Sequence, residues 1–474
     1  MPTGTLRIFF LILFLIFPRF SFQGIAQELT DTSGSIIVVK RLVISGNQTT
    51  KASVILRELM FKEGDTLEAS IFPKILSRSR DNLMNLGIFN FVDVTAAQDM
   101  GPYQTVLVNV VERWYVIPLP QFELVDRNFN EWIKSGDAGR INYGLNLDWT
   151  NFRGMNETLK LQFKWGYTRR FGLSYQLPFI NKNQDEGLSF FGYYTLSQEL
   201  GYAVKESKLL LYKADDDYAR EETSFGTRYT RRNGHFNTSF FGAEYRDLQV
   251  ADTIVALNPD YLSPGLFRQR MLMLSWGFRR DLRDYKYYPL NGYVFDMEVV
   301  KSGWGFIKDE PEWMVFTAQF RKYFAVAKKW YASYSIKGKL SGISETPYWV
   351  QRGFGYGNDL VRGYEYYVVP GQNFLLFKSN LKYNLLQTKV VSLPLPISEK
   401  FKTIPNAIYL NVGAESGYVR DRQFSKSNPL SNTVQLGYGV GLDYVTYYNL
   451  VFSVEYSFNR MGESGFFLHF AAPI

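Results

Sequence analysis

The side chains that most often carry covalent or metal chemistry are scarce in this sequence. The chain has 474 residues, no cysteine and only two histidines, His235 and His469. Without thiols there is no disulfide framework, no thiolate metal site and no cysteine nucleophile. The two histidines are far apart and no G-x-S-x-G nucleophile motif occurs, so a lipase-like triad has no evident members. We therefore expect a protein that is not an enzyme and that uses no metal or cofactor.

Three further motifs could be taken for ligand sites, and each has a simpler structural interpretation. Residues 353–357 and 437–441 are glycine-rich like nucleotide-binding loops, but no helix follows either of them. Loop flexibility and small inward-facing residues explain them better. The run Asp215-Asp216-Asp217 could bind a divalent cation, although such runs are usually solvated loop charge.

The elements that would position a site begin after an export signal. Arg7, the apolar run 8–17 and the small residues of Gly24-Ile25-Ala26 predict a signal peptide over residues 1–26. Ten apolar residues are too few to span a bilayer as a helix. The formal net charge of +8 is modest and gives no reason to expect a nucleic-acid partner.

A small α/β domain is predicted at residues 36–116, after a short segment at 27–35. A strand at 36–44 ends at Ser45-Gly46-Asn47 and is followed by helices near 50–60 and 70–86. Two strands, 91–96 and 103–112, complete the order β-α-α-β-β. About 80 residues can bury a core, though a small one.

Beyond this domain the hydropathy pattern changes to a period of two. Ile117-Pro118-Leu119-Pro120 marks a boundary, so residues 117–140 are assigned to a linker and barrel entry. From 141 to 474, segments such as 434–444 alternate apolar residues with Gln, Gly and Asp. Aromatic residues form 17% of the chain, which suits the aromatic girdles of a transmembrane β-barrel. Sixteen candidate strands predict a 16-stranded antiparallel barrel, with both ends of the barrel on the side of the α/β domain.

Several motifs resemble the outer-membrane assembly and translocation superfamily in which POTRA domains precede a barrel (BamA/TamA-like). Residues 44–47, 85–90 and 108–113 resemble POTRA signatures, and 151–154 resembles the family's first hairpin loop. Asp281 and Asp284, followed by 289–292, resemble a mid-barrel motif. The resemblance covers nearly the whole mature chain. It implies the outer membrane of a diderm (Gram-negative) bacterium, with the POTRA domain in the periplasm.

The most specific match is Val361-Arg362-Gly363-Tyr364, which resembles the family's motif in the sixth extracellular loop. Residues 344–373 are also the sixth such loop in the strand count. The resemblance implies that Arg362 is held inside the barrel by acidic residues of neighbouring strands. Here the usual glutamate and aspartate positions hold Lys382 and Asn411, which together with Glu415 are the candidate lumen partners of Arg362. Two arrangements fit this change: Glu415 replaces the usual acidic partner, or water in a wide lumen screens the charge.

The barrel seam is predicted between a first strand near 141–150 and a last strand at 465–472. Its candidate residues are Tyr143, Leu145, Leu147, Phe466, Leu468 and Phe470. An imperfectly paired seam exposes N–H and C=O groups that can template an added strand. The resemblance implies that unfolded outer-membrane clients enter there and also bind the POTRA sheet edge.

Two functions fit this architecture. The first is a factor that assembles or inserts outer-membrane β-barrel proteins, with clients, outer-membrane lipid or lipopolysaccharide, and periplasmic or lipoprotein accessory subunits as partners. The second is a pore that exports one dedicated partner protein, which a single POTRA domain also suits.

Overall fold

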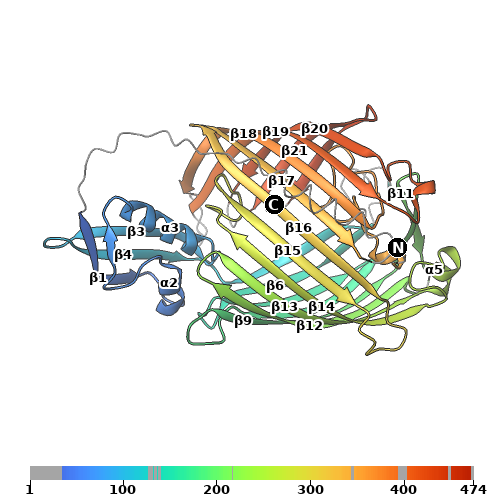
Figure 1. Ribbon diagram of the computed structural model, residues 1–474, viewed down its shortest axis with the longest axis horizontal. Helices are drawn as coiled ribbons and strands as arrows, with labels where there is room; N and C mark the ends of the chain where they lie inside the picture. Colours follow the sequence, from blue (N-terminus) through green and yellow to red (C-terminus); the bar gives the residue numbers. More distant parts are fainter. Residues whose placement is uncertain are drawn as a thin grey trace, which may run out of the picture.

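The computed structural model describes residues 35–125, 132, 136, 140–215, 217–342, 346–392, 403–446 and 450–470. The predicted signal peptide lies outside the described residues. An α/β domain sits at one end of a large antiparallel barrel (Figure 1). Among the described helices, none is long and apolar enough to cross a membrane.

The N-terminal domain has the predicted order of elements with one added strand. Its four-stranded sheet has the order β2-β1-β4-β3, and β1 and β4 run parallel. The three-residue strand β2 pairs with β1 and lies between the helices, where the sequence analysis placed none. The bounds are β1 Ile36–Ser45, α2 Ala52–Glu58, β2 Thr66–Glu68, α3 Phe72–Met84, β3 Phe89–Gln98 and β4 Tyr103–Glu112.

One hydrophobic core holds this domain together. Val39 of β1 and Val108 of β4 are fully buried against Ile55 of α2 and Leu83 of α3. Helix α3 begins with a proline in its first turn, where the missing N–H is harmless. It is followed by Gly87, whose φ of +73° gives the left-handed turn expected at that position.

The barrel is one sheet of sixteen strands, as predicted. Its order is β22-β21-β20-β19-β18-β17-β16-β15-β14-β13-β12-β9-β8-β7-β6-β5, and neighbouring strands pair antiparallel. The first eight strands along the chain are β5 Val116–Leu124, β6 Ile141–Phe152, β7 Glu157–Trp165, β8 Thr168–Leu177, β9 Glu186–Ser197, β12 Arg220–Asn233, β13 Asn237–Val250 and β14 Arg268–Asp281. The last eight are β15 Gly292–Ser302, β16 Trp313–Ala327, β17 Trp330–Ser341, β18 Asn373–Ser392, β19 Thr403–Arg420, β20 Val434–Val445, β21 Val451–Asn459 and β22 Ser464–Phe470.

The first barrel strand is not the predicted one. Residues assigned to the linker, 117–140, contain most of β5, which pairs with β6 along its whole length. The N-terminal domain therefore passes into the barrel within four residues, from Glu112 at the end of β4 to Val116. Two prolines caused the error, because proline excludes an interior strand but is compatible with an edge strand.

The alternating pattern sorts side chains onto two faces of the barrel wall. In β20 every second residue is exposed, including Leu436, Tyr438 and Val440, and the intervening residues are buried. Tyr438 and Phe458 stack on the outer face, with ring centroids 5.2 Å apart. The outer face is thus apolar and aromatic, as a lipid-facing surface requires.

The two ends of the barrel differ. Near the N-terminal domain the connections are short, such as residues 153–156 between β6 and β7. At the opposite end they carry the hairpin β10 Glu199–Lys205 and β11 Lys208–Lys213, the helix α5 Asp252–Leu257, and the turns η1 Tyr348–Val350 and η2 Ser425–Ser427 (Figure 1). We call residues 342–372, between β17 and β18, loop six, because this connection is the sixth at that end, as the strand count predicted.

Candidate functional site

Loop six is packed inside the barrel and not over its rim. Val361 and Tyr364 of the predicted motif are 1% and 4% exposed, and they pack with Phe354, Phe374 and Val419. Gly363 has a φ of +79°, and a Cβ there would lie 2.7 Å from the carbonyl oxygen of Phe458. Only glycine therefore fits at the point where the loop crosses β21.

Arg362 is buried between two glutamates. Its Nε lies 3.0 Å from Glu455 of β21 and 3.6 Å from Glu415 of β19. Its Nη2 donates to Asn380 of β18 at 3.0 Å, and its backbone N–H donates to Glu415, also at 3.0 Å. A guanidinium that is 8% exposed needs such partners, since an unpaired buried charge is strongly unfavourable. We call Arg362, Asn380, Glu415 and Glu455 the loop-six lock.

The other two predicted partners of Arg362 belong to a neighbouring cluster. Lys382 lies 3.8 Å from Asp443 of β20, and Asn411 donates to the same carboxylate at 2.7 Å. Tyr288 donates to Asp443 at 2.8 Å, and the Lys382 ammonium lies 4.0 Å from the Tyr288 ring centroid. Lys382 and Asn411, the two residues that differ from the family motif, therefore both contact Asp443. The sequence analysis missed Asp443 and Glu455, which alternation alone places on the inward face.

The seam of the sheet lies between β5 and β22, its two terminal strands, and no ladder joins them among the described residues. The seam residues predicted on the first strand, Tyr143, Leu145 and Leu147, belong instead to β6, the second strand. Their side chains face outward on β6, which pairs with β5. The true first strand, β5, lies in the predicted linker. On β22, Phe466 and Leu468 face outward with 66% and 38% exposure, whereas the side chain of Phe470 lies outside the description.

The N-terminal domain is docked on the barrel by a buried ion pair. Glu58, at the end of α2, is 2% exposed and receives two hydrogen bonds from Arg232 of β12, at 2.6 and 2.7 Å. Burial raises the pKa of Glu58, but the hydrogen bonds and charge of Arg232 outweigh it and hold the pKa below its usual value. The carboxylate is therefore ionised while the domain is docked.

Cation–π contacts and backbone hydrogen bonds extend this interface. The Arg57 guanidinium lies 4.2 Å from the ring centroid of Phe179, between β8 and β9. Arg78 of α3 covers Phe236 at 4.6 Å, between β12 and β13. Asn85 donates to the carbonyl of Asp284 at 2.9 Å and accepts from the Lys286 N–H at 2.8 Å. The mid-barrel motif of the sequence is therefore a turn that contacts the domain.

Further contacts reach the β6–β7 hairpin of the barrel. The Asn151 side chain donates to the Thr50 hydroxyl at 2.8 Å, and Thr50 itself donates to Glu112 at 2.7 Å. The N-cap position of α2 is Lys51, and no side-chain cap bond forms there. Thr50 therefore contributes to the interface with the barrel and does not cap α2. The N–H of Lys51 donates to the carbonyl of Gly154 at 2.9 Å.

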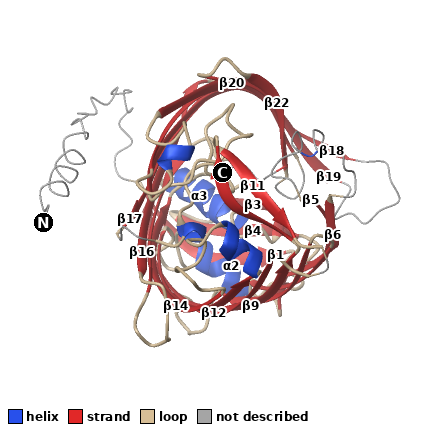
Figure 2. Ribbon diagram, turned by 90° about the vertical axis from the view of Figure 1, so that its right-hand side faces the viewer, coloured by secondary structure: helices blue, strands red, loops and turns tan. Residues whose placement is uncertain are grey.

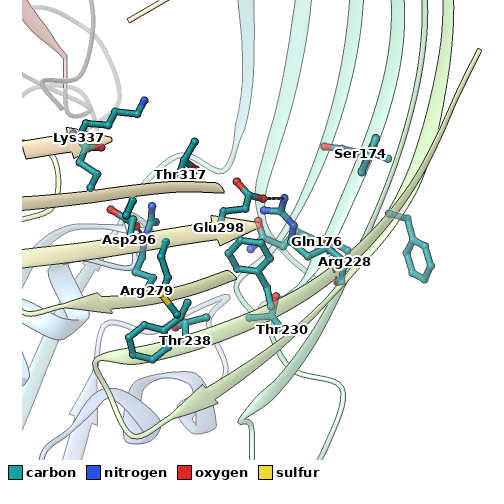
Figure 3. Close-up of a pocket in the computed structure, with 18 of the residues that line it drawn as sticks. Ser174, Gln176, Arg228, Thr230, Thr238, Arg279, Asp296, Glu298, Thr317 and Lys337 are labelled. Carbon is teal, nitrogen blue, oxygen red and sulfur yellow. Dashed lines mark hydrogen bonds and ion pairs between the residues drawn. The ribbon is translucent and has the colours of Figure 1, made fainter. Parts of the chain in front are cut away.

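These contacts place the domain across one opening of the barrel. Viewed along the barrel, α2 and α3 lie within the ring of strands (Figure 2). Barrel strands from β8 to β17 line a cavity of about 750 Å³ on the inner wall. Charged and polar side chains line it, including Arg228 and Glu298, whose charged groups are 3.7 Å apart, and Arg279 beside Asp296 (Figure 3).

An α/β domain docked under a 16-stranded barrel with an arginine-bearing internal loop defines a class of outer-membrane proteins. A family model described as the Omp85 superfamily domain matches residues 151–460, and one for POTRA, described as a surface antigen variable number repeat, matches 37–113. The chain belongs to the Omp85 superfamily. No curated protein sequence matches it significantly.

Solved structures share this fold at low sequence identity. BamA from Haemophilus ducreyi lacking POTRA domains 1–3 is 15% identical, with a TM-score of 0.52, over 92% of this chain and 84% of that one. CdiB from Escherichia coli is 10% identical, with a TM-score of 0.50, over 94% and 92%. CdiB from Acinetobacter baumannii is 15% identical, with a TM-score of 0.49, over 92% and 73%. The first two likenesses show the fold.

Proposed function

We propose that this protein assembles β-barrel proteins into the outer membrane of a Gram-negative bacterium, with its POTRA domain in the periplasm. An unfolded client would add its strands at the barrel seam. The work consists of backbone hydrogen bonding and needs no covalent step or cofactor. Outer-membrane lipid surrounds the barrel in this proposal, and periplasmic or lipoprotein subunits could assist.

The observation that carries this proposal is the seam. Strands β5 and β22 end the sheet order, and no described ladder connects them. A strand edge presents a row of donors and acceptors that a segment of almost any sequence can satisfy. Such tolerance suits a receptor for many clients. The outer edge of β3 in the POTRA sheet offers the same chemistry on the periplasmic side.

The docked POTRA domain gives further support. With Glu58 bound to Arg232, the domain lies across one opening, and loop six occupies the interior. A client in transit through the lumen would have to displace both. A client strand at the seam would displace neither, so this conformation favours work at the seam.

Client folding in proteoliposomes tests the proposal. The purified protein is reconstituted, an unfolded porin is added, and the protease-resistant folded porin is followed over time. We expect faster folding than in empty liposomes. The matched control is a proteoliposome containing the heat-denatured protein, and equal rates with a folded and an unfolded barrel would contradict the proposal.

Export of a dedicated partner is the alternative, and one feature favours it. The lumen wall is charged and polar around a sizeable cavity, as a passage for an unfolded chain would be (Figure 3). In that case the neighbouring genes should encode a secreted partner. A pull-down from cells would then recover that one protein and not a range of barrel proteins.

A further inference from the structure

The turn between β14 and β15, residues 282–291, contacts a distant part of the barrel wall, and we call it the crossing turn. In the sheet order β16, β17, β18 and β19 separate β15 from β20. Strands β14 and β20 lie on opposite sides of the ring of strands (Figure 2). Yet Tyr288 of this turn is 4% exposed and donates to Asp443 of β20 at 2.8 Å. The crossing turn therefore extends across the interior of the barrel.

Charged side chains hold the crossing turn in one conformation. The Asp284 carboxylate accepts hydrogen bonds from three backbone N–H groups of the turn, at 2.8, 3.1 and 3.1 Å. The Arg283 guanidinium is 8% exposed and donates to Asp281 at 2.7 and 2.9 Å. Hydrogen bonds with an ionised partner are stronger than neutral ones. The two aspartates of the mid-barrel motif thus form a framework that should make the turn move as one unit.

One side of the crossing turn is bound to the POTRA domain. Arg78 of α3 donates to the carbonyl of Arg283 at 3.1 Å. Asn85, directly after α3, donates to the carbonyl of Asp284 at 2.9 Å and accepts from the N–H of Lys286 at 2.8 Å. All three hydrogen bonds use backbone groups of the turn. The position of α3 therefore sets the position of the turn backbone.

The other side of the crossing turn belongs to the cluster around Asp443. The Tyr288 hydroxyl donates to Asp443, and the Lys382 ammonium lies 4.0 Å from the centroid of the Tyr288 ring. Lys382 itself is 3.8 Å from Asp443. Tyr288 thus contacts both members of this ion pair. Without Tyr288 the carboxylate loses a donor and the ammonium loses a cation–π contact.

Strand register places this cluster directly beside the loop-six lock. Asn411 of β19, Gly441 of β20 and Glu455 of β21 are direct neighbours across three strands. Asn411 donates to Asp443 at 2.7 Å, and Glu455 lies 3.0 Å from Arg362. Closely packed interiors transmit displacements from one side chain to the next. A shift of the cluster should therefore disturb the partners of Arg362.

We propose that the crossing turn couples docking of the POTRA domain to the loop-six lock. In the docked state, α3 holds the turn, and Tyr288 holds the Lys382–Asp443 pair beside the lock. When the domain undocks, the turn is released, Tyr288 leaves Asp443 and the lock loosens. The coupling is reciprocal, so loss of the lock also weakens docking. It is the same for insertion at the seam and for export through the lumen, and it does not depend on the proposed function.

Hydrogen exchange, measured by mass spectrometry on the intact chain in lipid nanodiscs, tests the coupling. Asn85→Ala removes both hydrogen bonds of that side chain to the crossing turn. The readout is the backbone N–H of Arg362, which donates to Glu415 at 3.0 Å. We expect it to exchange at least about fivefold faster than in the parent protein. Couplings between distant sites correspond to factors of that size or more, and exchange rates follow local opening.

Two further variants separate this path from a general loosening of the interface. His235 donates to the carbonyl of Arg57 at 3.0 Å, and its described hydrogen bonds do not involve the crossing turn. His235→Phe is therefore the matched control and should leave exchange at Arg362 unchanged. Tyr288→Phe removes only the hydroxyl group. We expect it to speed exchange at Arg362, and the added change Asn85→Ala should then have little further effect.

Three outcomes would overturn the proposal. In the first, Asn85→Ala speeds exchange at the N–H of Lys286, which it frees, but not at Arg362. In the second, His235→Phe acts as strongly as Asn85→Ala, so that docking as a whole is responsible. In the third, Asn85→Ala has its full effect in the Tyr288→Phe background.

The test stays decisive if one variant fails to fold. Should Asn85→Ala give no heat-modifiable barrel, Arg78→Ala takes its place, because it removes the hydrogen bond to the carbonyl of Arg283. The same three outcomes then apply. None of these readouts uses a client protein, so failure of the coupling and failure of the assembly function are separate results.

Discussion

At the scale of single residues, the loop-six lock shows that Arg362 has acidic partners although the family motif around it has changed. The family resemblance implied acidic partners for Arg362 at positions now held by Lys382 and Asn411. The structure supplies Glu455 from the next strand and retains Glu415, while Asp443 balances Lys382. Asp443 thus offsets the charge of the lysine that lies near the arginine. Glu415 was predictable from the sequence, but Glu455 was not, because its place beside loop six depends on the path of the loop.

Removing the arginine should destabilise the barrel. In Arg362→Ala, Glu455 and Glu415 remain buried without their shared cation, and losing one partner of such a pair costs about 3 kcal/mol. We expect the compact form to disappear at a lower temperature in heat-modifiability gels, and client folding to slow. Arg422→Ala, on an exposed arginine of the β19–β20 connection, is the matched control. A variant that melts and functions like the parent protein would exclude a role for the lock.

At the scale of elements, the alternation of apolar and polar residues correctly predicted the barrel strands, but it did not identify the strand that forms one edge of the seam. The period of two predicted a sixteen-stranded barrel and the lipid-facing side of β20 and β22, but it placed all sixteen strands after residue 140, where the described residues form fifteen. It did not reveal β5, whose two prolines are typical of a linker. The physical reason is that an edge strand needs only half of its N–H groups, and a sequence read alone does not show which half. The strand β2 was missed because three residues carry no recognisable pattern.

The contact of the β6–β7 hairpin with the POTRA domain is predicted to depend on one glycine. Gly154 has a φ of +72°, and a Cβ there would lie 2.2 Å from the carbonyl oxygen of Thr49. We expect Gly154→Ala to push the POTRA domain from the hairpin, which hydrogen exchange would detect as faster exchange of the Lys51 N–H. Gly234 has a similar φ of +63° in another periplasmic turn, but nothing lies within 4 Å of its Cβ position. Gly234→Ala is therefore the matched control, and equal exchange in both variants would contradict the steric argument.

At the scale of the whole molecule, the barrel is occupied from both ends. Loop six fills part of the interior from one side, and the POTRA domain covers the other opening (Figure 2). The inner wall of the barrel also borders a cavity of about 750 Å³. A closed resting state would preserve the permeability barrier of the membrane.

Docking of the POTRA domain should depend on pH, and the direction of this dependence follows from the lowered pKa of Glu58. Its pKa is lowered in the docked state, so docking gains stability above the ordinary carboxyl pKa of about 4.3 and loses it as the pH falls further. In planar bilayers we expect low conductance at pH 7 and frequent larger openings below about pH 4. Glu58→Gln should open at both pH values and lose this dependence. An equal change in conductance with pH in Glu58→Gln and in the parent protein would contradict the prediction.

The hydrophobic core of the POTRA domain includes side chains from outside the domain. Phe179, in the turn between β8 and β9, and Tyr115, which directly precedes the first barrel strand, are 8% exposed members of the same buried cluster as Val39 and Leu83. A fragment ending at Arg113 would lack both rings and would be less stable than the domain in the intact chain. During biosynthesis the POTRA segment leaves the ribosome before the barrel segment does, yet its packing is complete only after four barrel strands have formed. The core of the POTRA domain is therefore complete only where this part of the barrel is in place.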